Sequence, residues 1–341
     1  MNLADLNKIA LAMVTPGKGI LAADESGGTI KKRFDAIKVE STEDNRRDYR
    51  EMLFRSTEAM SKYISGVILY DETIWQNAKD GTPLIKLIEQ SGAIPGIKVD
   101  EGTQPLPGCP NELITVGLDK LAERLKKYYE RGARFAKWRA VIDIGAGIPS
   151  YTAIHTNAHA LARYAALCQA AQIVPIVEPE VLMDGDHDID RCYVVTEFML
   201  KETFQELYYQ KVALEGMVLK PNMAIAGKKS AKKSGVAEVA EKTVRLLKAC
   251  VPGAVPGIAF LSGGQSDEEA TAHLDAMNRI GGLPWNLTFS YGRALQAAPQ
   301  KAWSGKSENV TAAQRAFTHR AQMNGLAALG QWKSDLEKKA A

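Results

Sequence analysis

Short runs of apolar residues recur along the whole chain and have the β-rich composition of strands. They occupy residues 19–24, 63–70, 93–100, 133–144, 173–182, 216–223, 257–264 and 285–293. Most of these runs are continuously apolar instead of alternating with polar residues, which is typical of strands covered on both faces of a parallel sheet. The pattern therefore predicts eight buried strands.

The segments between the runs carry helix signals. Residues 41–44 and 266–269 have the spacing of capping boxes, and Gly132 is placed to end a helix. Apolar stripes with a helical period follow at 154–165 and 236–247. Strand and helix alternate eight times, which predicts an α/β fold of the (β/α)8 (TIM) barrel type, with an open doubly wound sheet as the alternative.

No Ser-, Gly- or Pro-rich linker divides the sequence, so we expect residues 1–341 to form a single domain. A barrel of this type commonly needs about 250 residues. The surplus includes residues 310–341, which we expect to form a C-terminal helix and tail, packed on the barrel or extending from it.

The composition of the chain argues against nucleic acid and membranes as binding partners. The chain is 45% hydrophobic and 24% charged, as is ordinary for a globular protein, and its net charge of +3 is too small to favour nucleic acid. No apolar stretch approaches the ~20 residues of a membrane span, and the N-terminus lacks the pattern of a secretory signal. The four scattered cysteines fit a reducing compartment. We therefore expect a cytoplasmic protein that binds neither nucleic acid nor membrane.

Charged residues stand at or near the ends of several apolar runs, where a barrel builds its active site. Four of them are Asp24, Lys137, Glu178 and Lys220. A polar rim or a barrel ion pair would explain any one of these residues alone. Several lysines and carboxylates that converge from different strands favour a shared, charged pocket.

Lys220 is the candidate nucleophile of this pocket. An exposed lysine side chain has a pKa of about 10.4 and reacts poorly at neutral pH, whereas partial burial and a neighbouring cation such as Lys137 destabilise the charged form. The free amine can attack a ketone, and the resulting iminium withdraws electrons from the adjacent carbon. A carbon–carbon bond can then break without a metal ion, while Glu178 or Asp24 handles the protons.

Three glycines, Gly263, Gly264 and Gly292, follow the seventh and eighth runs, where barrels often bind phosphate. Glycine lets backbone amides approach a phosphate closely, and Arg293 adds charge and hydrogen-bond donors. Ordinary turns would use the same glycines. Their position after the last two strands favours a phosphate site.

Seven stretches of the sequence resemble class I, Schiff-base fructose-1,6-bisphosphate aldolases, and they stand in the order of that family. They are GKGILAADES (17–26), PGIKVDEG (95–102), RFAKWRAV (134–141), VPIVEPE (174–180), LKPNM (219–223), FLSGGQSDEEAT (260–271) and LTFSYGRALQ (287–296). The resemblance covers nearly the whole chain. It implies reversible cleavage of fructose 1,6-bisphosphate to dihydroxyacetone phosphate and glyceraldehyde 3-phosphate, no cofactor, and a homotetramer.

The resemblance also implies roles for individual residues. Lys220 would form the Schiff base with C2 of the ketose phosphate and Glu178 would be the general acid/base. Asp24 and Lys137 would assist carbinolamine formation and proton transfer at the C4 hydroxyl. The phosphate of the dihydroxyacetone half would be bound by Ser262, Gly263, Gly292 and Arg293. The rest of the substrate would contact Thr29, Arg33, Lys98, Arg139 and Ser290.

Arg46 is a separate candidate for substrate binding. It places a positive charge in the first turn of a predicted helix, where the helix dipole disfavours it. A nearby anion would explain this position, and so would a solvated surface arginine.

Two histidines, His155 and His159, have the i, i+4 spacing of metal ligands on a helix. The glutamate of the zinc-protease motif is missing, so we interpret them as a polar helix face and predict no metal site.

Two alternatives to the bisphosphate reaction stay open: a Schiff-base aldolase for another ketose phosphate, and a scaffold protein that kept the barrel without turnover. One feature departs from the animal-type members of the family. Their tail closes with a tyrosine that assists proton exchange, whereas this sequence closes with Ala341.

Overall fold

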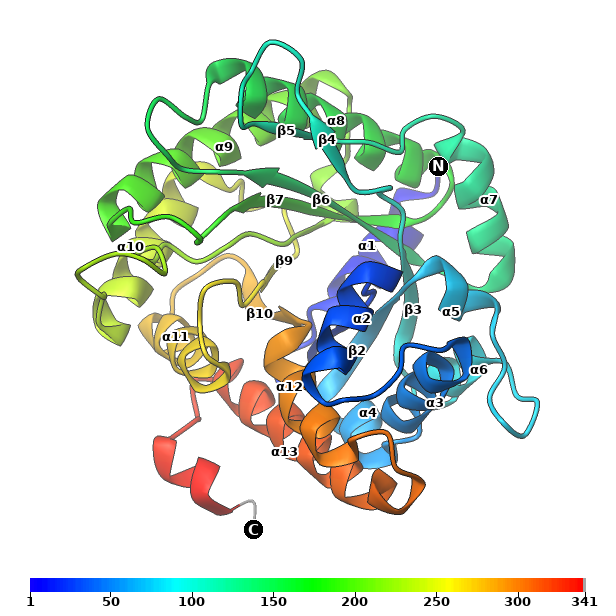
Figure 1. Ribbon diagram of the computed structural model, residues 1–341. Helices are drawn as coiled ribbons and strands as arrows, with labels where there is room; N and C mark the ends of the chain where they lie inside the picture. Colours follow the sequence, from blue (N-terminus) through cyan, green and yellow to red (C-terminus); the bar gives the residue numbers. More distant parts are fainter. Residues whose placement is uncertain (340–341) are drawn as a thin grey trace.

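The protein, described for residues 1–339 by a computed structural model, contains eight parallel strands that close into a barrel (Figure 1). Around the barrel the strands follow the order β1-β10-β9-β8-β7-β6-β3-β2. Each strand lies within one of the eight apolar runs, which confirms the predicted TIM barrel and excludes the open sheet. The strands are β1 Gly19–Ala23, β2 Ile64–Leu69, β3 Ile94–Lys98, β6 Phe135–Ile142, β7 Val174–Val181, β8 Val218–Leu219, β9 Gly257–Phe260 and β10 Asn286–Tyr291.

Helices connect the strands and cover the outside of the barrel (Figure 1). They are α1 Leu3–Met13, α2 Gly27–Ala36, α3 Glu43–Phe54, α4 Thr57–Tyr63, α5 Asp71–Trp75, α6 Leu84–Gln90, α7 Leu121–Arg131, α8 Tyr151–Ala170, α9 Ile189–Tyr209, α10 Val236–Cys250, α11 Asp267–Ile280, α12 Arg293–Trp303 and α13 Val310–Ala327. Short 3-10 turns lie at η1 Leu214–Gly216, η2 Ser307–Asn309 and η3 Ser334–Lys339. No helix within residues 1–339 combines the length and the apolar character needed to cross a membrane.

The predicted helix ends are mostly confirmed. Ser266 and Glu269 form the expected capping box at the start of α11, and Gly132 ends α7 with a φ of 119°. The box predicted at 41–44 is wrong by one residue. The N-cap of α3 is Thr42, whose side chain accepts a hydrogen bond from the backbone amide of Asn45.

Helix α1, which the sequence pattern did not predict, packs against one end of the barrel. Its residues Leu6, Ala10 and Met13 are buried in one apolar cluster with barrel residues such as Phe135 and Val218. The Phe135 ring is packed so tightly against β3 that a Cβ on Gly96 would lie 2.3 Å from it. A side chain at residue 96 would therefore overfill this end of the barrel.

Two further segments extend the barrel. A two-stranded antiparallel hairpin, β4 Thr103–Pro105 and β5 Leu113–Thr115, follows β3 in the sequence, and its β5 strand contacts β6 and α8. Helix α13 packs against α12, α11 and α4, and the η3 turn that follows is held by Glu337, which accepts hydrogen bonds from Arg320 at 2.6 Å and from Trp332 at 3.0 Å. The last two residues of the expected tail, Ala340 and Ala341, lie outside the described residues.

Candidate active site

The structure brings the predicted catalytic set together from four strands of the barrel. Asp24 directly follows β1, Lys137 and Glu178 lie on β6 and β7, and Lys220 directly follows β8. Lys220 Nζ is 3.0 Å from Glu178 Oε1, and Lys137 Nζ is 3.4 Å from Glu178 Oε2 and 2.7 Å from Asp24 Oδ2. The two amines therefore share one carboxylate.

Strand geometry explains this convergence. Lys137 and Arg139 are two residues apart on β6, so both project to the same face of the sheet, while Trp138 between them faces outward and stacks on Tyr164 of α8. In the adjacent strand, Glu178 is the register partner of Arg139. On its other side, Val177 of β7 is the register partner of Leu219, the last residue of β8, so Glu178 lies level with Lys220.

The proline behind Lys220 explains why the sixth apolar run stops at a lysine. Strand β8 spans only Val218–Leu219, and the Lys220 amide makes one further strand bond, to the Val177 carbonyl at 2.8 Å. Pro221 has no N–H to continue the ladder. The chain therefore leaves the sheet at the residue whose side chain enters the charged cluster.

The cluster consists of almost completely buried charges instead of the partly buried ones expected from the sequence. Lys220 and Lys137 are 4% exposed and Glu178 is 3% exposed. Burial opposes the ionised form of both Asp24 and Glu178, but the positive charges of the two lysines outweigh it and hold the pKa of each carboxyl below its usual value.

Lys137 remains a cation in this environment. Burial opposes its charge, but Asp24, Glu178 and Asp100 together raise its pKa above the ordinary lysine value. Lys137 is thus the neighbouring cation that the sequence suggested, although Lys220 is also in contact with an anion, Glu178.

Three carboxylates that sequence reasoning had not selected belong to the surroundings of this site. Asp100 Oδ1 is 3.4 Å from Lys98 Nζ, and its Oδ2 is 4.0 Å from Lys137 Nζ. Glu180 accepts a hydrogen bond from Arg139, and Glu25 accepts one from Arg33. A signal for all three was present in the sequence, because each lies in a stretch that resembles the aldolase family.

The predicted phosphate residues meet where the loop after β9 approaches the start of α12. Arg293 contacts Asp267 at 2.8 Å and donates hydrogen bonds to the backbone carbonyls of Ser262 and Gln265. Gly292 is the N-cap of α12. Gly264 has a φ of +78°, and a Cβ on it would lie 2.6 Å from the side chain of Met183. The loop therefore depends on glycine at this position.

Gly263 lies next to the carboxylate that holds Arg139. A Cβ on Gly263 would be 3.1 Å from Glu180 Oε1. Ser290, at the end of β10, is buried, and its hydroxyl has no hydrogen-bond partner among the described residues. Such a buried polar atom usually finds a partner, because leaving it unpaired costs about 1–3 kcal/mol.

Two of the residues predicted to contact the rest of the substrate, Arg33 and Thr29, lie on α2. The Arg33 guanidinium is beside Gly292, because a Cβ built on Gly292 would be 3.5 Å from Arg33 Nη2. Thr29 is an exposed residue four positions before Arg33 on the same helix, α2, and its hydroxyl lies 3.2 Å from the Ser26 hydroxyl.

Lys98 lies elsewhere at the mouth of the barrel. Its ammonium is 5.9 Å from the centre of the Tyr70 ring, and both residues line a hollow of about 420 Å³ together with Asp100 and Tyr128.

Arg46 is not joined to the lysine cluster by any contact among the described residues. Its guanidinium is paired with Glu72 and donates a hydrogen bond to the Ser41 carbonyl. An anion therefore does lie near Arg46, but it is a carboxylate of the protein.

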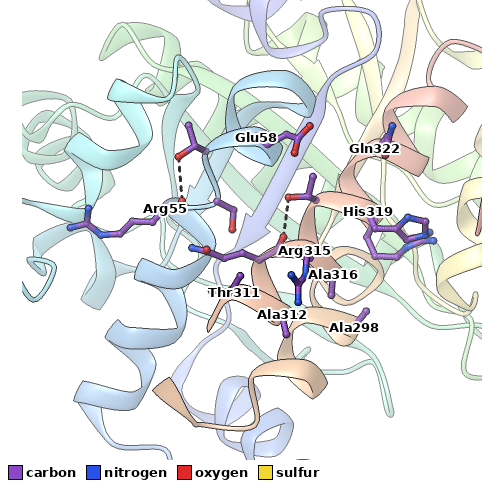
Figure 2. A pocket seen from close by; sticks show the side chains of 14 residues that line it. Arg55, Glu58, Ala298, Thr311, Ala312, Arg315, Ala316, His319 and Gln322 are labelled. Carbon is purple, nitrogen blue, oxygen red and sulfur yellow. Dashed lines mark hydrogen bonds between the residues drawn. The ribbon is translucent and has the colours of Figure 1, made fainter. Parts of the chain in front are cut away.

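A second hollow, of about 1030 Å³, lies on the outer surface between α4 and α13 (Figure 2). It is lined by Arg55, Glu58, Arg315 and His319 among others, and by no lysine. Because it offers no amine beside a carboxylate, it is not a candidate for Schiff-base chemistry.

Comparison with known proteins agrees with the architecture. The family model of class-I fructose-bisphosphate aldolases, described as glycolytic, matches residues 5–341. The chain belongs to this family. It is accordingly an enzyme of the aldolase class with a TIM-barrel fold, as the seven sequence stretches implied.

Individual aldolases match over almost their whole length. The chain is 58% identical over 334 residues to a probable fructose-bisphosphate aldolase class 1 of Xanthomonas campestris. The aligned region covers 98% of this chain and 100% of that protein. It is 55% identical over 324 residues to cytosolic fructose-bisphosphate aldolase 4 of Arabidopsis thaliana, covering 95% and 82% of the two chains.

A solved structure gives the same result in three dimensions. The fructose-bisphosphate aldolase of Plasmodium falciparum, in complex with TRAP and a small-molecule inhibitor, superimposes with a TM-score of 0.96 at 50% identity. The match covers 97% of this chain and 96% of that one.

Proposed function

We propose that the protein reversibly cleaves fructose 1,6-bisphosphate into dihydroxyacetone phosphate and glyceraldehyde 3-phosphate through a Schiff base on Lys220. The observation that carries the proposal is the contact of Lys220 Nζ with Glu178 Oε1 at 3.0 Å inside a buried charge cluster. Membership of the aldolase family supplies the substrate.

The first chemical step joins the amine to the sugar. Lys220 must lose a proton before its nitrogen attacks the C2 carbonyl, and the Glu178 carboxylate is within hydrogen-bond reach to accept that proton. The carbinolamine then loses water, for which a protonated group is needed at the leaving oxygen. Lys137, which stays charged among three carboxylates, is placed near enough to assist.

The second step breaks the bond between C3 and C4. A base removes the proton of the C4 hydroxyl, the aldehyde leaves, and the bonding electrons move into the iminium to give an enamine. Glu178 and Asp24 are the carboxylates available for this proton, since both are held ionised by the lysines. Protonation at C3 and hydrolysis of the imine release dihydroxyacetone phosphate and restore Lys220.

The substrate's phosphates are proposed to bind at the two sides of the mouth. Ser262, Gly263, Gly264, Gly292 and Arg293 would hold the phosphate of the dihydroxyacetone half, as the glycine-rich loop and the helix N-cap favour. Because Arg33 lies beside Gly292, Arg33 and its neighbour Thr29 on α2 would also contact the phosphate of the dihydroxyacetone half.

Lys98, in the hollow beside Tyr70, would meet the other end of the sugar phosphate. Arg139, whose partner Glu180 lies next to Gly263, and the Ser290 hydroxyl, which has no hydrogen-bond partner among the described residues, would contact the sugar chain between the two phosphates.

Covalent trapping tests this proposal directly. The protein is incubated with dihydroxyacetone phosphate, reduced with sodium borohydride and digested, and the peptides are analysed by mass spectrometry. One adduct is expected, on Lys220. Label on another lysine, or activity that requires a metal and leaves no adduct, would reject the mechanism.

Steady-state kinetics distinguish the remaining candidates. A coupled assay for triose phosphate release separates an active aldolase from a barrel that serves only as a scaffold. Relative kcat/KM values for fructose 1,6-bisphosphate and other ketose phosphates then identify the preferred substrate.

We also propose a homotetramer and a cytoplasmic location. The family resemblance implies the tetramer, and the location is supported by the scattered cysteines and by the cytosolic Arabidopsis relative. Sedimentation equilibrium should give about four times the chain mass of 37.2 kDa. A mass that stays near that of one chain at micromolar concentration would contradict the tetramer.

A further inference from the structure

Helices α8 and α9 lie side by side on the outside of the barrel (Figure 1) and face each other with two histidines and two glutamates. His155 and His159 are one turn apart on α8, and Glu202 and Glu206 are one turn apart on α9. One ligand atom each from His155, Glu202 and Glu206 lie within 4.8 Å of one another. We propose that these three residues, with His159 as a fourth ligand, bind a transition-metal dication of the zinc class.

The distances suit such an ion. His155 Nδ1 lies 2.7 Å from Glu202 Oε1 and 3.6 Å from Glu206 Oε1, and His159 Nδ1 lies 2.8 Å from Glu206 Oε2. In a tetrahedral site with bonds of about 2.0–2.2 Å, neighbouring ligand atoms are about 3.3–3.5 Å apart. The observed contacts bracket this range, so small side-chain rotations would admit the ion.

The charges of the cluster point to a cation as well. Within residues 1–339, no lysine or arginine nitrogen lies within 4.0 Å of a carboxylate oxygen of Glu202 or Glu206. The Glu206 side chain is only 7% exposed, and its oxygens face imidazole nitrogens alone. Among the described residues the two carboxylates therefore have no lysine or arginine counter-charge within 4.0 Å, and a dication would balance both.

The histidine side of the cluster is open to solvent. The His155 and His159 side chains are 43% and 44% exposed, which leaves a path for an ion from the solvent side. Tyr151 stacks on the His155 ring at 5.5 Å and donates a hydrogen bond to Glu202 Oε1 at 3.3 Å. Such an outer contact orients a metal-binding carboxylate.

The sequence pattern alone had assigned the two histidines to a polar helix face. The two carboxylates that would complete the site come from α9, more than 40 residues later in the chain, so the spacing on α8 alone does not show them. The competing explanation is a set of histidine–glutamate ion pairs without a metal. Only the metal site predicts saturable binding of one ion.

Calorimetry with the full-length protein tests the proposal. After treatment with a chelator and its removal, titration with ZnCl2 should show one site per chain that is lost or weakened at least about 10-fold in His155→Asn and in Glu202→Gln. The matched control is His319→Asn, because His319 also contacts a glutamate, Glu337 at 3.1 Å, but has no second histidine beside it. This control should bind like the wild type.

A spectroscopic measurement identifies the ligands. CoCl2 bound at this site should give the visible absorption of a tetrahedral ion with nitrogen and oxygen ligands, and His155→Asn should remove it. Absence of saturable binding in the wild type, or equal binding by His155→Asn and the wild type, would overturn the proposal. Neither readout depends on aldolase activity, so the Schiff-base proposal can fail or hold separately.

Discussion

Lys220 can act as a nucleophile only after its nitrogen has lost a proton, and the residue beside it decides where that proton goes. Glu178 accepts contacts from both lysines, and the pKa of Glu178 is lowered because those two charges outweigh its burial. A single carboxylate thus connects the proposed nucleophile with a permanent cation. This arrangement fits repeated proton transfer better than a fixed structural ion pair.

Replacing Lys220 by arginine keeps the positive charge but should abolish turnover. A guanidinium stays protonated at any working pH and cannot form an imine, so kcat should fall by at least about 1,000-fold. The coupled triose phosphate assay measures this. As a control, Lys228→Arg, in the exposed loop after β8, should leave kcat unchanged. Wild-type kcat in Lys220→Arg would contradict the proposed nucleophile.

Arg293→Ala should weaken substrate binding more than it slows the chemical step. Arg293 holds Asp267 and the loop carbonyls at the proposed phosphate site, so its loss should raise KM for the bisphosphate by about 10-fold or more. Arg315→Ala, an exposed arginine in the hollow of Figure 2, is the matched control and should leave KM unchanged. If KM and kcat of Arg293→Ala both equal those of the wild type, Arg293 lies outside the site.

For single residues, the sequence predicted which ones form the catalytic cluster, but it did not predict the contacts made by the arginines around it. Asp24, Lys137, Glu178 and Lys220 could be selected because each ends or interrupts an apolar run. The placement of Arg33 beside Gly292 could not be read from the sequence, because it depends on the path of α2 over the end of β10. The pairing of Arg46 with Glu72 likewise depends on where the fold places α3 relative to α5.

The loop after β9 shows how one element shapes the site. Gly264 adopts a left-handed conformation there, with the Met183 side chain against its Cα. Gly264→Ala should therefore lower the free energy of unfolding by about 1–3 kcal/mol, since alanine is strained at positive φ and its methyl group would overlap Met183. Urea unfolding followed by circular dichroism measures the change.

The control for this substitution is another glycine with free space around it. A Cβ on Gly28 of α2 would meet nothing within 4 Å, and alanine is the better helix former. Gly28→Ala should leave the free energy of unfolding unchanged or raise it by up to about 1 kcal/mol. Equal effects of the two substitutions would show that the Gly264 conformation is not required.

Element boundaries followed from local signals wherever those signals were strong. The capping box at Ser266 and the terminal Gly132 were both predicted, because they involve residues within one turn. The 41–44 box failed because Ser41 and Thr42 are both suitable caps, and the path of the chain into α3 selects Thr42. Helix α1 and the β4–β5 hairpin were missed, since short amphipathic segments are defined mainly by what they pack against.

For the whole molecule, the buried carboxylates make stability depend on pH. Asp24 and Glu178 have folded pKa values below the ordinary values of 3.8 and 4.5, so the stability they contribute is present above those values and is lost as the pH falls. The free energy of unfolding should therefore decline below about pH 4, because the unfolded chain takes up protons that the folded chain does not.

An amide at residue 24 should make this decline shallower. Asp24→Asn removes one group that takes up a proton on unfolding, so the slope of unfolding free energy against pH between about pH 4 and pH 2 should be smaller than in the wild type. Urea denaturation at a series of pH values gives both slopes. Parallel curves for the two proteins would contradict the lowered pKa of Asp24. A general loss of packing would shift the curve without changing its slope.

The overall fold was the most predictable level. Eight apolar runs with helices between them predict a barrel whatever the individual side chains are, because parallel strands covered by helices on one side can bury their other face by closing into a barrel. Whether the chain behaves as one domain stays a prediction, as does the tetramer.

The barrel closes between its first and last strands, where Ile20 is the register partner of Ser290. During synthesis, β1 must therefore wait while the ribosome adds the residues that end with β10. At about 5–20 residues per second this delay lasts roughly 15–50 s. Until then the edges of β1 and of the growing sheet are unpaired, and Ser290 is not yet in its position next to β1. The nascent chain consequently presents an unpaired strand edge, to which strands of other chains can pair, until translation is nearly finished.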